Sequence, residues 1–114
     1  MKIRKFNIYL ADLSPRFGTE PGKTRPVVVL QTNLLNDSLH PSTIICPIST
    51  NVVHGVEILR VHLPKKGTGL RKDSDILVDQ IRSIDNRRFV KNLGELGPID
   101  KAKLIENLKV LLFE

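Results

Sequence analysis

The sequence predicts a small α+β domain, a strongly bent antiparallel β-sheet or open barrel covered by one C-terminal helix. Three observations predict it. Short apolar segments with a two-residue alternation recur as far as residue 84 of the 114-residue chain. After residue 100 the period changes to that of an amphipathic helix. No linker, repeat or low-complexity tract separates these two parts, so residues 1–114 are expected to form a single, mainly β domain.

The first two strands are the clearest patterns. Residues 8–13 alternate in character and stop at Ser14-Pro15, which predicts a strand of about seven residues. Residues 14–24 contain two prolines and two glycines and are expected to form a surface loop that returns to a strand at Arg25. The continuous β-branched run Val27–Leu30 is typical of a strand buried on both faces.

The next two strands are shorter. Thr32-Asn33 and Asn36–Ser38 mark a break in the chain. The apolar run Thr43–Ile48 predicts a third strand, but Pro47 cannot donate to a ladder, so the end of this strand is not expected in the middle of the sheet. Residues 57–63 alternate as a fourth strand.

A fifth strand and a helix complete the expected fold. Residues 75–84 alternate without interruption, which predicts one strand with Gln80 and Arg82 on the same face. Asp100 is a good N-cap and predicts the start of the helix. The apolar face of that helix is expected to contain Leu104, Ile105, Leu108, Leu111 and Leu112.

Composition indicates an ordinary globular protein with a basic surface. Hydrophobic residues make up 40% of the chain and charged residues 26%, which argues against disorder. No apolar run is long enough to cross a bilayer and the N-terminal residues lack the apolar stretch of a signal peptide, so we expect a cytoplasmic protein without membrane contact. A formal net charge of +6 favours polyanionic partners and weakly suggests nucleic acid.

Arg25 is the strongest candidate for a functional residue. It stands at the mouth of an apolar strand, and its guanidinium suits phosphate and stays charged. Ser49 and Thr50 follow the third strand, so a hydroxyl could meet the arginine at one end of the sheet as a phosphate site. Equally plain alternatives are an ion pair of Arg25 with Glu20 or Asp79, and ordinary turn chemistry for the two hydroxyls.

A basic loop follows the fourth strand. It has two glycines and no acidic residue, and it could track a nucleic-acid backbone, although a solvated loop is the more common case. Gln80 and Arg82 could read base edges or phosphate, or be simple exposed positions. The basic residues of the loop are Arg60, Lys65, Lys66, Arg71 and Lys72.

The remaining reactive residue types suggest no metal or cofactor. Cys46 lies inside an apolar strand and is expected to be a buried, inert thiol rather than a nucleophile. The spacing of the three histidines suggests neither a metal site nor a catalytic pair. Asp73, Asp75 and Asp79 would suit a metal-dependent nuclease, but a turn leading into a strand is the better interpretation.

Two ordered signatures resemble the MazF/PemK family of toxins from toxin-antitoxin pairs. The first is Ile8–Pro15 followed by Gly18–Glu20, Gly22 and Thr24–Val29, and the second is Lys72–Asp85. The resemblance runs from about Ile8 to Leu112. It implies an SH3-like β-barrel with a C-terminal helix, a homodimer, a cognate antitoxin partner, and sequence-specific cleavage of single-stranded RNA without metal.

The resemblance also implies a mechanism and a site. Family members attack the phosphate with the ribose 2′-hydroxyl and leave a 2′,3′-cyclic phosphate and a 5′-hydroxyl. Arg25 and Ser49 correspond to the catalytic residues, with Thr50 as the neighbouring alternative hydroxyl, and no residue stands out as the general base. Many members have threonine where Ser49 stands, and Gly-Asp in place of Phe6-Asn7. The residues expected to contact RNA are Arg16, Glu20, Lys23, Lys65, Lys66, Gln80, Arg82 and Ser83.

Two alternatives remain open beside the endoribonuclease toxin. A toxin of the same fold could act without catalysis, for instance as a topoisomerase poison. A general RNA-binding barrel would also fit the basic charge. The pair of Arg25 with Ser49 or Thr50 favours the enzyme, because a protein that only binds has no need of it.

Overall fold

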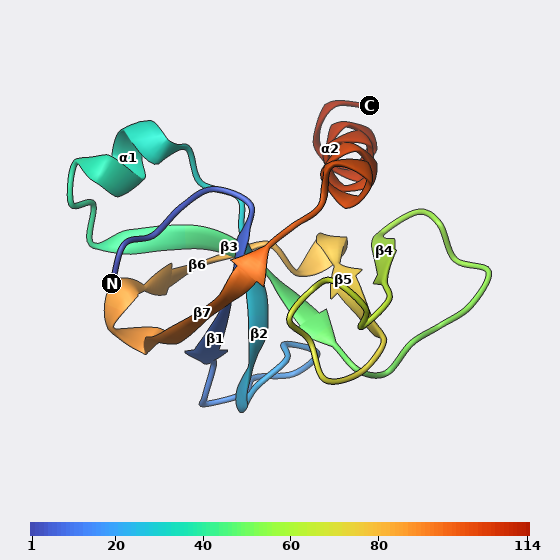
Figure 1. Cartoon of the computed structure of the whole chain (residues 1–114), viewed down its shortest axis with the longest axis horizontal. Coiled ribbons are helices and arrows are strands. Elements are labelled where there is room, and N and C mark those ends of the chain that lie inside the picture. The colour runs from blue at the N-terminus through green and yellow to red at the C-terminus, as the bar shows by residue number, and fades with distance from the viewer.

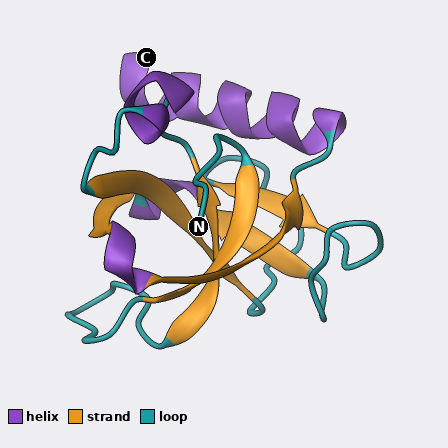
Figure 2. Cartoon of the chain, turned by 60° about the vertical axis from the view of Figure 1, so that its left-hand side comes forward, coloured by secondary structure: helices purple, strands orange, loops and turns teal.

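Antiparallel pairing of short strands forms one strongly bent sheet in the computed structural model, which describes all 114 residues (Figures 1 and 2). The strand order is β4-β5-β3-β2-β1-β7, and β6 pairs with β3 beside β5. The strands are β1 (Asn7–Asp12), β2 (Thr24–Val29), β3 (Ser42–Ser49), β4 (Arg60–Leu63), β5 (Ser74–Leu77), β6 (Arg82–Asp85) and β7 (Phe89–Glu95). The α+β class predicted from the sequence is confirmed.

Strand β3 is central, contrary to the expectation drawn from Pro47. It pairs with β2 on one side, and on the other side with β6 up to Ile45 and with β5 from Ile48. Pro47 therefore stands between the two partners on that side. The missing amide donor costs the ladder little, because no strand pairs with Pro47 on that side, while Val27 of β2 pairs with it on the other.

The predicted single strand over residues 75–84 is wrong. Strand β5 ends at Leu77, and a 3₁₀ turn, η1 (Val78–Gln80), leads into β6. The alternation hid this break because Val78 is buried in the same cluster as Ile76. As a result Gln80 and Arg82 do not share a strand face.

Two apolar clusters pack against the two faces of the sheet. The first contains Val28, Cys46, Ile48 and Ile76 and continues to Leu104 of helix α2 (Pro98–Phe113), which lies across one side of the sheet in Figure 2. The second includes Tyr9, Ala11, Leu13, Val27, Val29, Ile45 and Ile84. Burying apolar side chains on both faces is what the continuous β-branched pattern of β2 predicted.

The helix begins before the expected residue. Gly97 is the N-cap and Pro98 occupies the first turn, where a proline loses no hydrogen bond, so Asp100 lies inside the helix rather than at its cap. Leu104 is fully buried, and Leu108 and Leu111 pack on the first cluster. Ile105 and Leu112, predicted for the same face, remain 40% and 56% exposed.

Several short elements had no counterpart in the sequence prediction. These are β7, the helix α1 (Asn33–Asp37) and the 3₁₀ turn η2 (Asn86–Arg88). Strands β4 and β7 end the sheet without pairing to each other, so the implied barrel is open rather than closed. No helix combines the length and the apolar character needed to span a membrane.

Candidate active site

Arg25 lies at the start of β2, opposite Ala11 of β1, and is half-buried. Its Nε donates a hydrogen bond of 2.8 Å to the Gly22 carbonyl, and it forms no ion pair. The alternative of an ion pair with Glu20 or Asp79 is therefore wrong. Its other guanidinium N–H groups remain without a carboxylate, as an anion-binding arginine requires.

A second arginine reinforces this positive charge. The loop between β1 and β2 folds back so that Arg16 packs against Gly22, where a side-chain carbon would come within 2.7 Å of the Arg16 Cβ. Glycine therefore permits the close approach. Burial first, and then the charge of Arg16, lowers the pKa of Arg25 from its ordinary value. Two cations without an ion-pairing carboxylate thus mark this end of the sheet.

Ser49 lies at the same end of the sheet and on the same face as Arg25. Val27–Pro47 is the last pair between β2 and β3, and Arg25 and Ser49 each stand two residues beyond it, toward the same end of the sheet. Val27 and Ile45 belong to the second cluster, and alternation along each strand turns Arg25 and Ser49 toward that face. The Ser49 Oγ accepts the Asn51 amide at 3.1 Å, which leaves its own hydroxyl hydrogen to donate elsewhere.

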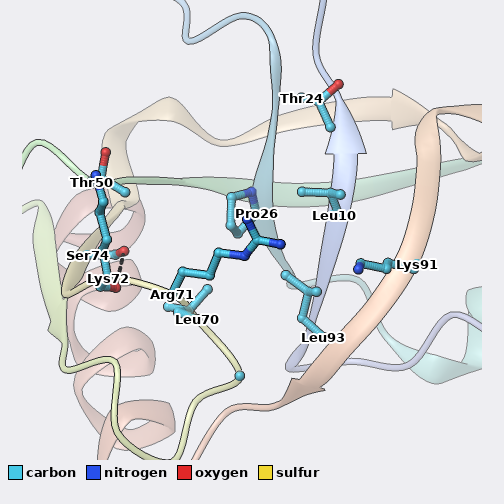
Figure 3. A pocket seen from close by; sticks show the side chains of 11 residues that line it. Leu10, Thr24, Pro26, Thr50, Leu70, Arg71, Lys72, Ser74, Lys91 and Leu93 are labelled. Atoms are coloured by element: carbon cyan, nitrogen blue, oxygen red, sulfur yellow. Dashed lines mark hydrogen bonds between the residues drawn. The ribbon is translucent and has the colours of Figure 1, made fainter.

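Thr50 points to the other face, where it lines a cleft of about 440 Å³ (Figure 3). Arg71, Lys72 and Lys91 supply charge there, and Arg71 extends toward Pro26 in Figure 3. No carboxylate is part of the lining. The complete lining is Leu10, Thr24, Pro26, Thr50, Gly69, Leu70, Arg71, Lys72, Ser74, Lys91 and Leu93. Hence the two hydroxyls that the sequence left as alternatives face opposite sides of the sheet.

The predicted RNA contacts divide between the two faces. Arg82 lies opposite Ile45 in the β3–β6 register and so faces the side of Arg25, and its Nη1 is buried without a hydrogen-bond partner. Ser83 is exposed on β6, and Gln80 ends the η1 turn. The remaining five lie in loops: Arg16, Glu20 and Lys23 before β2, and Lys65 with Lys66 after β4.

A buried ion-pair network beside Ser49 was missed from the sequence. Asp75 binds Arg60 at 2.9 Å and His62 at 2.6 Å, and the rings of His62 and His54 lie 5.2 Å apart. No local spacing in the sequence indicates this network, because it depends on the β4–β5 register that places His62 opposite Asp75. Asp73 instead accepts the Lys65 amide, and the three aspartates considered from their spacing do not gather into a metal-binding group.

Cys46 behaves as the sequence predicted. It is fully buried and carries no disulfide. Burial raises the pKa of its thiol to about 12, with a smaller contribution from Asp79, so the nucleophilic thiolate is strongly disfavoured.

Comparison with known proteins identifies the family. The family described as PemK-like, MazF-like toxin of type II toxin-antitoxin system matches residues 4–112. Endoribonuclease MazF of Staphylococcus epidermidis is 38% identical over 104 residues, 91% of this chain and 83% of that protein. Endoribonuclease EndoA of Bacillus subtilis (strain 168) is 33% identical over 112 residues, 98% of this chain and 96% of that protein.

Solved structures agree with this assignment. The crystal structure of MazF from Deinococcus radiodurans aligns with a TM-score of 0.83 and 25% identity, covering 100% of this chain and 99% of that one. The resemblance inferred from the two sequence signatures is confirmed. The chain therefore belongs to the PemK-like, MazF-like toxins of type II toxin-antitoxin systems.

Proposed function

We propose that this toxin cleaves single-stranded RNA at specific sequences, without a metal ion, by attack of a ribose 2′-hydroxyl on the adjacent phosphate. Endoribonuclease activity follows from the two curated relatives, both endoribonucleases that align with more than nine tenths of the chain. The observation that carries the mechanism is Arg25, a half-buried cation without a carboxylate partner, on the same sheet face as Ser49.

The reaction builds negative charge on a five-coordinate phosphorus, and fixed donors at that place lower its barrier. Arg25 supplies a charged donor, and Arg16 adds a second positive charge from the neighbouring loop. Ser49 donates its hydroxyl hydrogen to a nonbridging phosphate oxygen. The products are a 2′,3′-cyclic phosphate and a 5′-hydroxyl end, because the attacking nucleophile belongs to the substrate.

Arg82 supports an anionic ligand on this face. A buried guanidinium nitrogen without a hydrogen-bond partner is costly, and a phosphate would satisfy it if the Arg82 side chain turned toward the bound RNA. Arg82 faces the same side of the sheet as Arg25, four residues along β3 from the position of Ser49. We assign it to the binding of the RNA backbone farther along this face, about 13 Å from Ser49 at the rise of a β-strand.

The antitoxin is proposed to be an acidic, partly disordered segment that lies along basic surface of the toxin. The cleft behind the active site suits such a segment, because three cations and no carboxylate line it. We further propose a homodimer, as the family resemblance implies. The identity of the antitoxin would come from the gene beside that of the toxin.

Two functions without catalysis compete with this proposal. A topoisomerase poison or a simple RNA-binding protein would need a basic surface but not a fixed cation facing a hydroxyl at one end of the sheet. Relatives that are endoribonucleases at 38% and 33% identity favour the enzyme. Cleavage itself distinguishes the three functions.

The test is cleavage of a mixed-sequence RNA pool by the purified toxin in excess EDTA. We expect fragments with cyclic phosphate ends, whose sequences define the recognition site. Arg25→Ala should reduce cleavage by about a hundredfold or more, as expected for loss of a charged transition-state donor, and leave the melting temperature within a few degrees. Absence of cleavage across a diverse pool contradicts the enzyme, and cleavage that EDTA abolishes contradicts the metal-independent mechanism.

A further inference from the structure

We propose that Asp75 is a positioning residue for RNA cleavage, which holds the Ser49 hydroxyl in place through Arg60 and the backbone of Asn51. The inference rests on the proposed function, because it takes Ser49 as the group that binds the scissile phosphate. Asp75 lies opposite Ser49 in the β3–β5 register, and its side chain is only 1% exposed. A carboxylate buried beside the active-site hydroxyl calls for a structural or functional reason.

The carboxylate of Asp75 has donors on both oxygens. Oδ2 accepts the Val53 amide at 3.0 Å and Arg60 Nη1 at 2.9 Å, while Oδ1 contacts His62 Nδ1 at 2.6 Å. Burial alone would raise the pKa of Asp75, but the hydrogen bonds from Val53, Arg60 and His62 outweigh it and the pKa lies below its ordinary value. The group therefore stays ionised across the neutral range and keeps these three donors.

A continuous chain of hydrogen bonds connects this carboxylate to Ser49. Arg60 Nη1, which binds Asp75, also donates to the Asn51 carbonyl at 2.9 Å. The Asn51 amide in turn donates to Ser49 Oγ at 3.1 Å. Arg60 and Asp75 thus hold two consecutive peptide groups, 51–52 and 52–53, in the turn that follows Ser49.

This arrangement restrains the one torsion on which the catalytic hydroxyl depends. Serine lacks the methyl group that limits the rotamers of threonine, so its χ1 angle needs an external restraint. The Asn51 amide provides that restraint, and it directs the free hydroxyl hydrogen away from the turn. Displacing a reacting group by about 1 Å can cost about a hundredfold in rate, so loosening this turn should reduce kcat.

A purely stabilising ion pair is the competing explanation, and kinetics separate the two. Asp75→Asn keeps the shape of the side chain but removes the charge that binds Arg60. We expect kcat to fall by about 10- to 100-fold, KM to change by less than about twofold, and the folded state to persist at the assay temperature. The matched control is Asp73→Asn, an exposed carboxylate just before β5 that accepts only the Lys65 amide, for which kcat should stay within about twofold.

A double-mutant cycle with Ser49→Ala provides the decisive measurement. If Asp75 acts through Ser49, then Asp75→Asn in the Ser49→Ala background should lower the residual kcat by less than about twofold. An equal loss in both backgrounds, or an unchanged kcat in Asp75→Asn, overturns the inference. Should Asp75→Asn fail to fold, Arg60→Gln removes the Nη1 donor that binds both Asp75 and the Asn51 carbonyl, and the same cycle applies.

The outcomes distinguish this inference from the proposed function. A wild-type toxin that cleaves no RNA overturns both. A wild-type toxin that cleaves, together with a Ser49→Ala variant that has lost most activity and an Asp75→Asn variant that has not, overturns the role of Asp75 alone.

Discussion

Arg16 lies close enough to Arg25 to lower the pKa of its guanidinium, although the two residues belong to different segments of the chain. Like charges repel, so the folded protein holds this pair together at a cost. A phosphate between them removes the repulsion and gains two charged hydrogen bonds. The loop that carries Arg16 therefore belongs to the proposed substrate site.

Arg16→Gln should weaken RNA binding more than it slows the chemical step. We expect KM to rise several-fold with a smaller change in kcat, because Arg16 is exposed and contributes charge from the loop rather than from the sheet. Loss of one phosphate contact should lower the slope of log K against log salt by about 0.7. Fluorescence anisotropy with a non-cleavable RNA across a salt series measures this slope, and an unchanged slope would contradict the contact.

Ser49→Ala and Thr50→Ala should differ although the residues are neighbours. Ser49 shares a sheet face with Arg25, whereas Thr50 lines the cleft on the other face. Removing a donor to the developing charge typically costs about a hundredfold in kcat, so Ser49→Ala should show that loss while Thr50→Ala stays within about fivefold. Single-turnover cleavage rates decide between them, and the reverse order would make Thr50 the catalytic hydroxyl.

The sequence predicted the elements whose local pattern coincides with their burial. Val27–Val29 and the helix around Leu104 are buried as their apolar spacing indicated. Strand β7 escaped prediction because Phe89–Glu95 contains no fully buried residue and its pairing with β1 is irregular. The short helix α1 likewise has no buried residue, so no apolar period marks it.

The sequence predicted only those residues of the candidate site that stand at the end of an apolar strand. Arg25 and Ser49 stand at the ends of apolar strands, and their positions could be inferred from those strands. The network of Asp75 with Arg60 and His62 could not, because it depends on the register between β4 and β5 rather than on any local spacing. That Ser49 and Thr50 face opposite sides follows from strand alternation, but which of them shares a face with Arg25 depends on the register between β2 and β3.

Gly69 should tolerate a side chain far less than Gly67. Both have a positive φ, +76° and +79°, so alanine at either position carries a similar backbone cost of about 1 kcal/mol. At Gly67 the added carbon meets nothing within 4 Å, but at Gly69 it would lie 2.1 Å from the Leu93 carbonyl oxygen, on the wall of the cleft. Gly69→Ala should therefore lower stability by at least about 1 kcal/mol more than Gly67→Ala, measured by urea unfolding. Equal losses would contradict this close approach.

Alkaline pH should destabilise the protein through Cys46. The pKa of its thiol rises from the ordinary value of 9.0 to about 12 in the folded protein, because burial disfavours the thiolate. A group whose folded pKa is raised contributes stability that is complete below pH 9 and declines as the pH rises toward 12. Cys46→Ala removes this titration, so the free energy of unfolding of this variant should fall less over that pH range than that of the wild type, even though the smaller side chain lowers stability at neutral pH.

Thiol labelling at pH 8 provides the second measurement. The native protein should react with a soluble disulfide reagent only after unfolding in urea. Rapid labelling of the folded protein would show that Cys46 is accessible.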